Sequence, residues 1–305
     1  MSDTLHKYLA LDHGTRVQAV RLEDAWRTGL AHQDLPPVLR GLLGELAAAA
    51  VLLASNIKFN GSIVLQLQGN GPARLIVVEC TADLGLRATA HVREGADIPA
   101  DGTLQTLLNA DGQGRFMVML DPAERAAGTP AYQGIVPLEG ETVAEALEHY
   151  MRNSEQLDTR MWLAADERHC AGFLLQRMPE TGGQAAEPGA EPSWERFVAL
   201  AETLQAAELL AEDTETLIHR LFWQDDLRMF EPRSVRWHCP CSRERVANML
   251  RSLGRAEIDS ILREQEQVQI ACNFCGKPYA FDAVDCAMLF TDSPQIPQEP
   301  GRTLH

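Results

Sequence analysis

The segments His238-Cys239-Pro240-Cys241 and Cys272-Asn273-Phe274-Cys275-Gly276-Lys277 decide the architecture of the C-terminal part of this chain. Each segment contributes two cysteines, and thirty residues separate the pairs. Four soft thiolates in a tetrahedral arrangement are what zinc prefers, and a structural zinc site has all four positions filled. The pattern predicts that Cys239, Cys241, Cys272 and Cys275 bind one zinc ion per chain, with His238 as a weaker competitor for a ligand position.

The residues around the cysteines predict a small zinc-binding unit over residues 232–290. Gly276 suits a tight turn between strands at 268–271 and 278–281, and Gly254 separates two short helices. The apolar residues of these helices recur at helical spacing: Val246, Met249, Leu250, Leu253, Ile258, Ile261 and Leu262. A unit of this size cannot build a substantial core, and zinc supplies roughly 10–16 kcal/mol in zinc-finger peptides. The metal is therefore expected to hold the unit folded.

The C-x-C spacing of the first pair is unusual, because structural sites mostly use C-x₂₋₄-C on both halves. Two cysteines this close can bridge locally only in a small, strained ring, and strained exposed disulfides are the labile, regulatory kind. Zinc-bound thiolates remain nucleophilic, so peroxide can oxidise them. Oxidation of the ligands would release the metal and remove the main source of stability of the unit.

Upstream, residues 1–178 predict a mixed, strand-rich domain of the α+β class. Period-two apolar patterns indicate strands at 62–68, 74–80, 86–92, 115–120, 133–138, 160–164 and 172–176. Gly69-Asn70-Gly71 is a hairpin signal, and the close spacing favours antiparallel neighbours. One helix is expected from Pro37, and another from Thr142 with Glu145 completing a capping box. The apolar stretch 46–55 is too short for a bilayer, which needs about 20 residues, and predicts a buried helix.

Between the two domains, residues 179–231 predict a linker. Pro179–Ser193 is rich in Gly, Pro, Ala and Glu and is expected to be flexible. Trp194, Phe197, Val198 and Ala201, and then Leu217, Ile218, Leu221 and Phe222, recur at helical spacing. These amphipathic helices must lie against the first domain, each other or a partner. Residues 291–305 form a tail.

Composition narrows the class of protein. The 305 residues carry 27 basic and 43 acidic side chains, a net charge of −16 that disfavours general nucleic-acid and anionic-membrane binding. The N-terminus lacks the pattern of a secretory signal, which leads us to expect the reducing cytoplasm. The three remaining cysteines, Cys80, Cys170 and Cys286, are isolated among apolar neighbours and are expected to be buried thiols.

The chain resembles the 33 kDa chaperonin family, the redox-regulated heat-shock chaperones of bacteria. The resemblance is carried by the C-x-C and C-x-x-C spacing, and by four further segments: 222–226 (FWQDD), 231–233 (EPR), 132–138 (YQGIVPL) and 153–156 (NSEQ). It covers essentially the whole chain apart from the tail and the Gly/Pro-rich segment.

This resemblance implies an ATP-independent holdase, not an enzyme, that is compact and nearly inactive when reduced and zinc-bound. Oxidation would form the disulfides Cys239–Cys241 and Cys272–Cys275, release zinc, and unfold the zinc unit and the helical linker. The protein would then form a homodimer, hold unfolding clients, and pass them to ATP-dependent refolding chaperones. The exposed linker faces make five residues candidates for client binding: Trp194, Phe197, Leu217, Leu221 and Phe222.

Two alternatives belong to other classes. The first alternative is a zinc-ribbon protein that binds nucleic acid or has a regulatory role. It would use the local basic face of Arg243, Arg245, Arg251 and Arg255, although the net charge of −16 disfavours nucleic-acid binding. A thiol–disulfide oxidoreductase would set its C-x-x-C at a helix start in a βαβ unit, whereas Cys272 follows an expected strand. No Ser/His/Asp constellation or carboxylate pair indicates catalysis, so no catalytic residue is predicted.

Overall fold

The computed structural model describes residues 3–124, 132–179 and 192–290. Contacts divide the chain into a first unit, Met1–Cys239, and a second unit, Pro240–His305. The division lies inside the C-P-C segment, eight residues beyond the expected start at 232, because short strands at 233–237 pair with the first unit. The flexible segment expected at 179–193 and the tail at 291–305 lie almost wholly outside the described residues, and the domain division made from the sequence stays a prediction.

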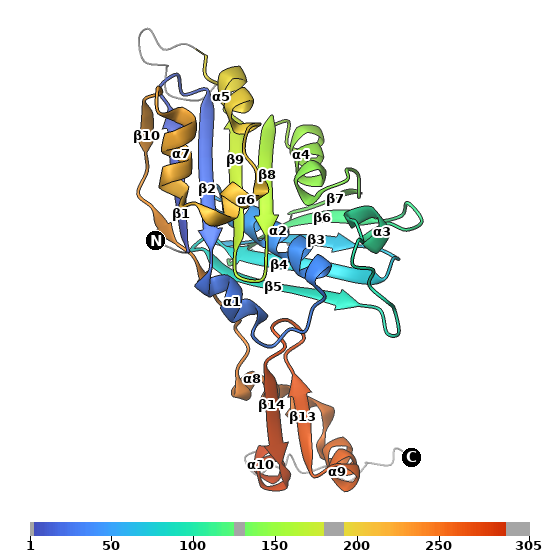
Figure 1. Cartoon of the computed structure of the whole chain (residues 1–305). Coiled ribbons are helices and arrows are strands. Elements are labelled where there is room, and N and C mark those ends of the chain that lie inside the picture. Colours follow the sequence, from blue (N-terminus) through green and yellow to red (C-terminus); the bar gives the residue numbers. More distant parts are fainter. Residues whose placement is uncertain (1–2, 125–131, 180–191, 291–305) are drawn as a thin grey trace, which may run out of the picture. The chain divides into compact units, whose positions relative to one another are not determined.

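The first unit contains two six-stranded sheets, both visible in Figure 1. The first sheet has the order β10-β1-β2-β9-β8, with β11 also paired to β1, and the second has the order β12-β5-β4-β3-β6-β7. All pairs are antiparallel except β12 with β5. The strands of the first sheet are β1 (Thr4–Ala10), β2 (Thr15–Leu22), β8 (Thr159–Ala165), β9 (Cys170–Arg177), β10 (Leu227–Met229) and β11 (Arg233–Ser234). Those of the second are β3 (Gly61–Gln68), β4 (Ala73–Thr81), β5 (Gly85–Val92), β6 (Arg115–Pro122), β7 (Tyr132–Pro137) and β12 (Arg236–Trp237).

These strands confirm the sequence-based strands from residue 62 onward, and the α+β class with them. The hairpin at Gly69-Asn70-Gly71 joins β3 to β4, where the Gly69 amide donates to the Arg74 carbonyl over 3.2 Å. Gly69 must be glycine, because a Cβ there would lie 1.4 Å from the Leu108 carbonyl oxygen. Strands β1 and β2, which the sequence pattern did not predict, complete the first sheet.

Helix α2 (Pro37–Ala54) forms the centre of the first unit. It contacts strands of both sheets and is buried along two-thirds of its length, with Leu39, Leu43 and Leu46 all at 0 % exposure. By length and composition α2 is the one helix among the described residues that could cross a membrane. Its apolar surface is explained by the two sheets that cover it, so the buried helix expected at 46–55 is confirmed.

The other helices of the first unit lie around the sheets: α1 (Asp24–Leu30), α3 (Leu104–Leu108) and α4 (Val143–Asn153). Helix α4 begins after Thr142, whose hydroxyl accepts from the Glu145 amide over 3.2 Å. The reciprocal half of the expected capping box is displaced by one residue, since the Glu145 carboxylate accepts from the Glu141 amide over 2.7 Å. This hydrogen bond ties the loop before the helix to the first turn of α4.

Three linker helices cover the outer face of the first sheet: α5 (Trp194–Ala201), α6 (Ala206–Ala211) and α7 (Thr214–Phe222). The sequence pattern predicted α5 and α7 but not α6. Their apolar faces form one cluster with side chains of β1, β2, β8 and β9, among them Tyr8, Val17 and Phe173. The first domain is therefore the surface against which the amphipathic linker packs.

The second unit is a short hairpin surrounded by helices. Strands β13 (Gln267–Ala271) and β14 (Pro278–Asp282) pair antiparallel, and the helices are α8 (Arg243–Leu253), α9 (Arg255–Glu264) and α10 (Ala283–Leu289). Gly254 separates α8 from α9 with a φ of 91°, as its glycine identity predicted. The buried cluster of this unit has nine residues, too few to supply much stability by burial alone.

Candidate metal centre

The two cysteine segments are positioned by different elements. Cys272 and Cys275 lie in the turn between β13 and β14, which is closed by hydrogen bonds from the Cys272 amide to the Lys277 carbonyl and from the Gly276 amide to the Cys272 carbonyl, both 2.9 Å. Gly276 has a φ of 70°, a conformation that favours glycine. Cys239 and Cys241 precede α8, whose N-cap Ser242 accepts from the Arg245 amide over 3.1 Å.

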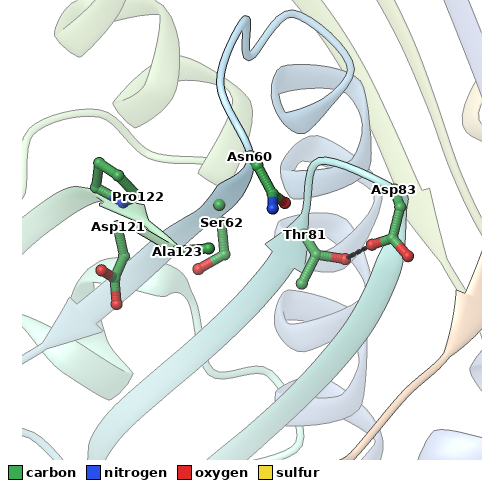
Figure 2. Close-up of a pocket in the computed structure, with 8 residues that line it drawn as sticks. Asn60, Ser62, Thr81, Asp83, Asp121, Pro122 and Ala123 are labelled. Carbon is green, nitrogen blue, oxygen red and sulfur yellow. Dashed lines mark hydrogen bonds between the residues drawn. The ribbon is translucent and has the colours of Figure 1, made fainter. Parts of the chain in front are cut away.

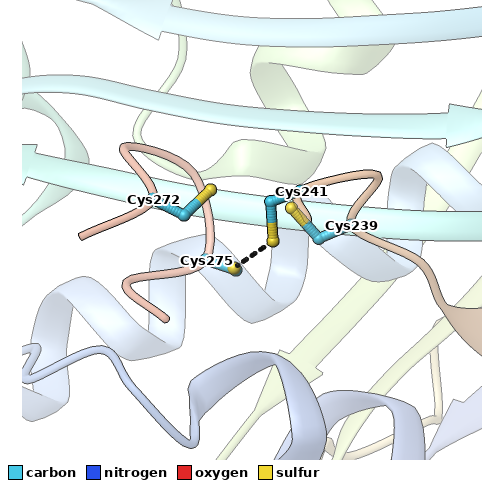
Figure 3. Close-up of side chains that lie close together, drawn as sticks. All are labelled: Cys239, Cys241, Cys272 and Cys275. Carbon is cyan, nitrogen blue, oxygen red and sulfur yellow. Dashed lines mark hydrogen bonds between the residues drawn. The ribbon is translucent and has the colours of Figure 1, made fainter. Parts of the chain in front are cut away.

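The four sulfur atoms converge, as Figure 3 shows. All four Sγ atoms lie within 4.8 Å of one another, and Cys241 Sγ is 3.5 Å from Cys275 Sγ. A tetrahedron of zinc–sulfur bonds of about 2.3 Å places its sulfurs about 3.8 Å apart. The cluster is therefore close to the dimensions of a four-thiolate metal site, and its donor atoms suit a soft ion.

Tyr279 and Arg243 are neighbours of the cluster in the second unit. Cys275 is 6 % exposed and the other three cysteines are half-buried. The Tyr279 hydroxyl is buried and makes no hydrogen bond of standard geometry within the described residues, and the nearby Cys241 sulfur, followed by burial, raises its pKa. Arg243 joins α8 to the hairpin and α10, since it donates to the Ala280 carbonyl and the Asp285 carboxylate, both at 2.6 Å.

The remaining cysteines are outside the cluster. All seven cysteines lie in the described part of the chain and none forms a disulfide. Cys80, Cys170 and Cys286 are buried as expected, and burial raises the pKa of each thiol, which keeps it protonated. The chemically distinctive cysteines are therefore the four that the spacing selected.

Three of the four arginines of the basic face proposed for nucleic acid have partners within the second unit. Arg243 pairs with Asp285, Arg255 lies 3.6 Å from Asp259, and Arg251 donates to the Leu289 carbonyl over 3.0 Å. Residues 240–290 carry six basic and seven acidic side chains. This unit does not offer the cationic surface that phosphate binding requires.

A polar hollow of about 660 Å³ lies beside β3, β4 and β6 in the first unit (Figure 2). The Asp83 carboxylate in it accepts hydrogen bonds from Thr81 and Arg236, which lower its pKa to about 2. The described residues that line the hollow include no cysteine, histidine or lysine. Its carboxylates and hydroxyls have no histidine, lysine or cysteine beside them among the described lining residues, and the Thr81 hydroxyl is hydrogen-bonded to Asp83, so the cysteine cluster remains the centre of interest.

A family model described as Hsp33 protein matches residues 3–282. The chain belongs to the Hsp33 family. Full-length Hsp33 relatives named 33 kDa chaperonin include one from Methylobacillus flagellatus, 46 % identical over 300 residues and 97 % of each chain. Another, from Chromobacterium violaceum, is 43 % identical over 288 residues and 94 % of each chain. The solved structure of the 33 kDa chaperonin of Thermotoga maritima has the same fold, with a TM-score of 0.76 over 95 % of this chain and 98 % of that one at 21 % identity.

Hsp33 membership confirms the resemblance seen in the sequence. The structure also shows where the client-binding candidates lie. Phe197, Leu217, Leu221 and Phe222 are buried under 9 % exposure in the linker cluster, and Trp194 is half-buried there. In this state four of the five candidate side chains are covered, and the linker would have to leave the sheet before those four could touch another protein.

Contacts that hold the linker were not visible in the sequence. His6 of β1 lies between two residues of α7, with its Nδ1 2.6 Å from the Thr214 hydroxyl and its Nε2 3.2 Å from the Glu215 carboxylate. Burial lowers the pKa of His6, although Glu215 opposes this effect. Arg21 of β2 donates to the Leu210 carbonyl over 2.7 Å. These partners are about 200 residues apart, and no local pattern signals them.

Proposed function

We propose that this protein is an ATP-independent holdase chaperone whose client-binding surface is covered while one zinc ion is bound by Cys239, Cys241, Cys272 and Cys275. Membership of the Hsp33 family supports the chaperone activity, and so does the name of its relatives, 33 kDa chaperonin. The sequence contains no Walker-type phosphate loop, which agrees with independence from ATP. The clients are unfolding proteins, and the protein is a binding protein and not an enzyme.

The observation that carries the metal part of the proposal is the convergence of four sulfur atoms within 4.8 Å. The same cysteines supply the release step. Cys239 with Cys241, and Cys272 with Cys275, each form a disulfide when a peroxide takes two electrons from two thiolates and is reduced to water. Each pair requires one peroxide, and two disulfides leave zinc without thiolate ligands. The second unit then loses its main source of stability.

The packing of the linker supports the activation step. Helices α5, α6 and α7 hide their apolar faces on the first sheet, so their release exposes both the helix faces and the sheet face. A contiguous apolar surface of this kind captures unfolded chains. The oxidised protein is a homodimer in the cytoplasm, and it passes its clients to ATP-dependent refolding chaperones.

The test combines zinc content, free-thiol count and an aggregation assay before and after peroxide. We expect loss of one zinc and four thiols per chain together with suppression of aggregation of a heat-unfolded protein. Cys286→Ala is the matched control, since Cys286 is buried in the second unit but lies outside the cluster, and it is expected to keep both zinc and activation. Retention of zinc in an oxidised, fully active protein would contradict the release mechanism.

A further inference from the structure

A second cavity of the first unit has the character of a ligand site. It measures about 340 Å³, within the range of small-molecule pockets, and lies where the end of α2, strands β3 and β6, and helix α4 meet. Its walls are mainly apolar, with Leu53, Ile63, Val118 and Met151 among them. A few polar groups enter it, as in binding pockets that orient a ligand.

Arg16 of β2 is the more buried of the two cations that line this cavity, the other being Lys58. Its guanidinium donates to the Gln176 amide oxygen over 2.9 Å, and Gln176 is only 4 % exposed. The Gln176 amide nitrogen donates in turn to the Thr159 hydroxyl over 3.2 Å, which fixes the oxygen toward Arg16. Among the described residues no carboxylate lies within 4.0 Å of this guanidinium. The positive charge of the half-buried Arg16 is therefore not neutralised by its hydrogen-bond partner, the uncharged Gln176.

The neighbouring charges favour an anion. Lys7 is also bound by neutral acceptors, the Ser55 carbonyl at 2.9 Å and the Asn56 amide oxygen at 3.0 Å, and Asn56 lines the cavity. Burial, followed by the charges of Arg16 and Arg233, lowers the pKa of Lys7 to about 8. Lys58, an exposed residue, adds a further cation to the lining.

One carboxylate is present in the lining, and it already accepts two hydrogen bonds. Glu155 is exposed, and its Oε1 accepts from the Tyr150 hydroxyl over 2.7 Å and from the Tyr132 hydroxyl over 3.2 Å. These two hydroxyls donate to Glu155, whereas the more deeply placed Arg16 has no anionic partner among the described residues.

We propose that this cavity binds a small carboxylic acid with an apolar body, whose carboxylate is held by Arg16. The apolar walls take the body of the ligand, and the guanidinium takes both carboxylate oxygens, the geometry for which its planar fork is suited. The site is independent of the cysteine cluster, since all its residues belong to the first unit.

The test measures binding of octanoate to the reduced, zinc-loaded full chain by calorimetry, with 1-octanol as the neutral probe of the same length. Charged hydrogen bonds contribute enough that octanoate should bind at least about tenfold more tightly than octanol. Arg16→Gln should abolish that preference, and Arg16→Lys should retain part of it. Arg27→Gln, an exposed arginine of α1, should leave it unchanged.

A second measurement uses the unaltered protein and does not depend on a variant that folds. With labelled methionine methyl groups, octanoate should give nuclear Overhauser contacts to Met151, which is 7 % exposed and lines the cavity. Equal affinity for octanol and octanoate, a preference that survives in a folded Arg16→Gln protein, or bound octanoate without contacts to Met151 would each overturn the proposal.

Discussion

Replacing Phe197 with alanine should partly activate the reduced protein. Phe197 is 1 % exposed on α5 and stacks on Phe222 of α7 with ring centroids 4.3 Å apart; Phe222 in turn lies 6.2 Å from Phe173 of the first sheet. The ring belongs to the cluster between linker and sheet and not to the central core around α2. Its loss should therefore weaken linker docking more than it weakens the two-sheet core.

The size of the effect follows from burial. Truncation of a buried Phe to Ala costs about 3–5 kcal/mol. A loss of about 3 kcal/mol changes the ratio of docked to undocked linker by roughly a hundredfold. A docked state that excludes clients in the wild type would then open often enough to bind them, without oxidation and with zinc still in place.

The assay is suppression of aggregation of a heat-unfolded protein in the presence of reductant and zinc, together with limited proteolysis of the linker. Trp223→Ala is the matched control, because Trp223 follows Phe222 but is 67 % exposed. We expect faster cleavage within 194–230 and partial chaperone activity for Phe197→Ala only. Equal behaviour of the two variants, or a loosened linker without any gain in activity, would refute the reasoning that linker docking keeps the protein inactive.

Three further outcomes are expected. Cys275→Ser should abolish stable zinc binding and unfold the second unit, as seen by zinc analysis and by loss of protection in hydrogen exchange over 240–290, whereas Cys286→Ala should keep the metal. Burial raises the pKa of Glu45 on α2 to about 7 from an ordinary value of 4.5. Between pH 4.5 and 7 the folded state therefore binds more protons than the unfolded state. The stability that the protonated Glu45 contributes is present at low pH and is lost as pH rises from 4.5 through 7. The free energy of unfolding in urea should therefore be lower at pH 7.5 than at pH 5 in the wild type, and Glu45→Gln should lack this contribution. Gly41→Ala in the second turn of α2, where a Cβ would meet nothing within 4 Å, should stabilise the protein by about 0.5–1 kcal/mol in the same assay.

The cysteine cluster and the strands β3 to β9 could be predicted because their signals are local. Spacing alone selected the four cysteines, and period-two alternation identified β3 to β9. The alternation is broken in β1 and β2, where His6 and Gln18 are buried polar residues. Gln18 reaches Ser55, and His6 reaches Thr214 of the linker. A buried polar residue is satisfied by partners far along the chain, which the local sequence does not disclose.

The short strands after the linker were missed for a related reason. β10, β11 and β12 have three, two and two residues, too few for a periodic pattern, and they are strands only because β1 and β5 offer open edges. Val235 between them is 4 % exposed and belongs to the central core. The cavity at Arg16 likewise depends on how the two sheets meet, and the sequence near Arg16 carries no sign of it.

The pairing of β1 with β10 and β11 has a consequence for how the chain is made. Thr4 lies opposite Ser234, so the first strand to leave the ribosome cannot complete its pairing until about 230 further residues have been added. At about 5–20 residues per second this interval lasts roughly ten to fifty seconds. During that time the nascent sheet has an unprotected edge of the kind that aggregates. The edge of β1 therefore stays open during synthesis until β10 and β11, the last strands of its sheet, can pair with it.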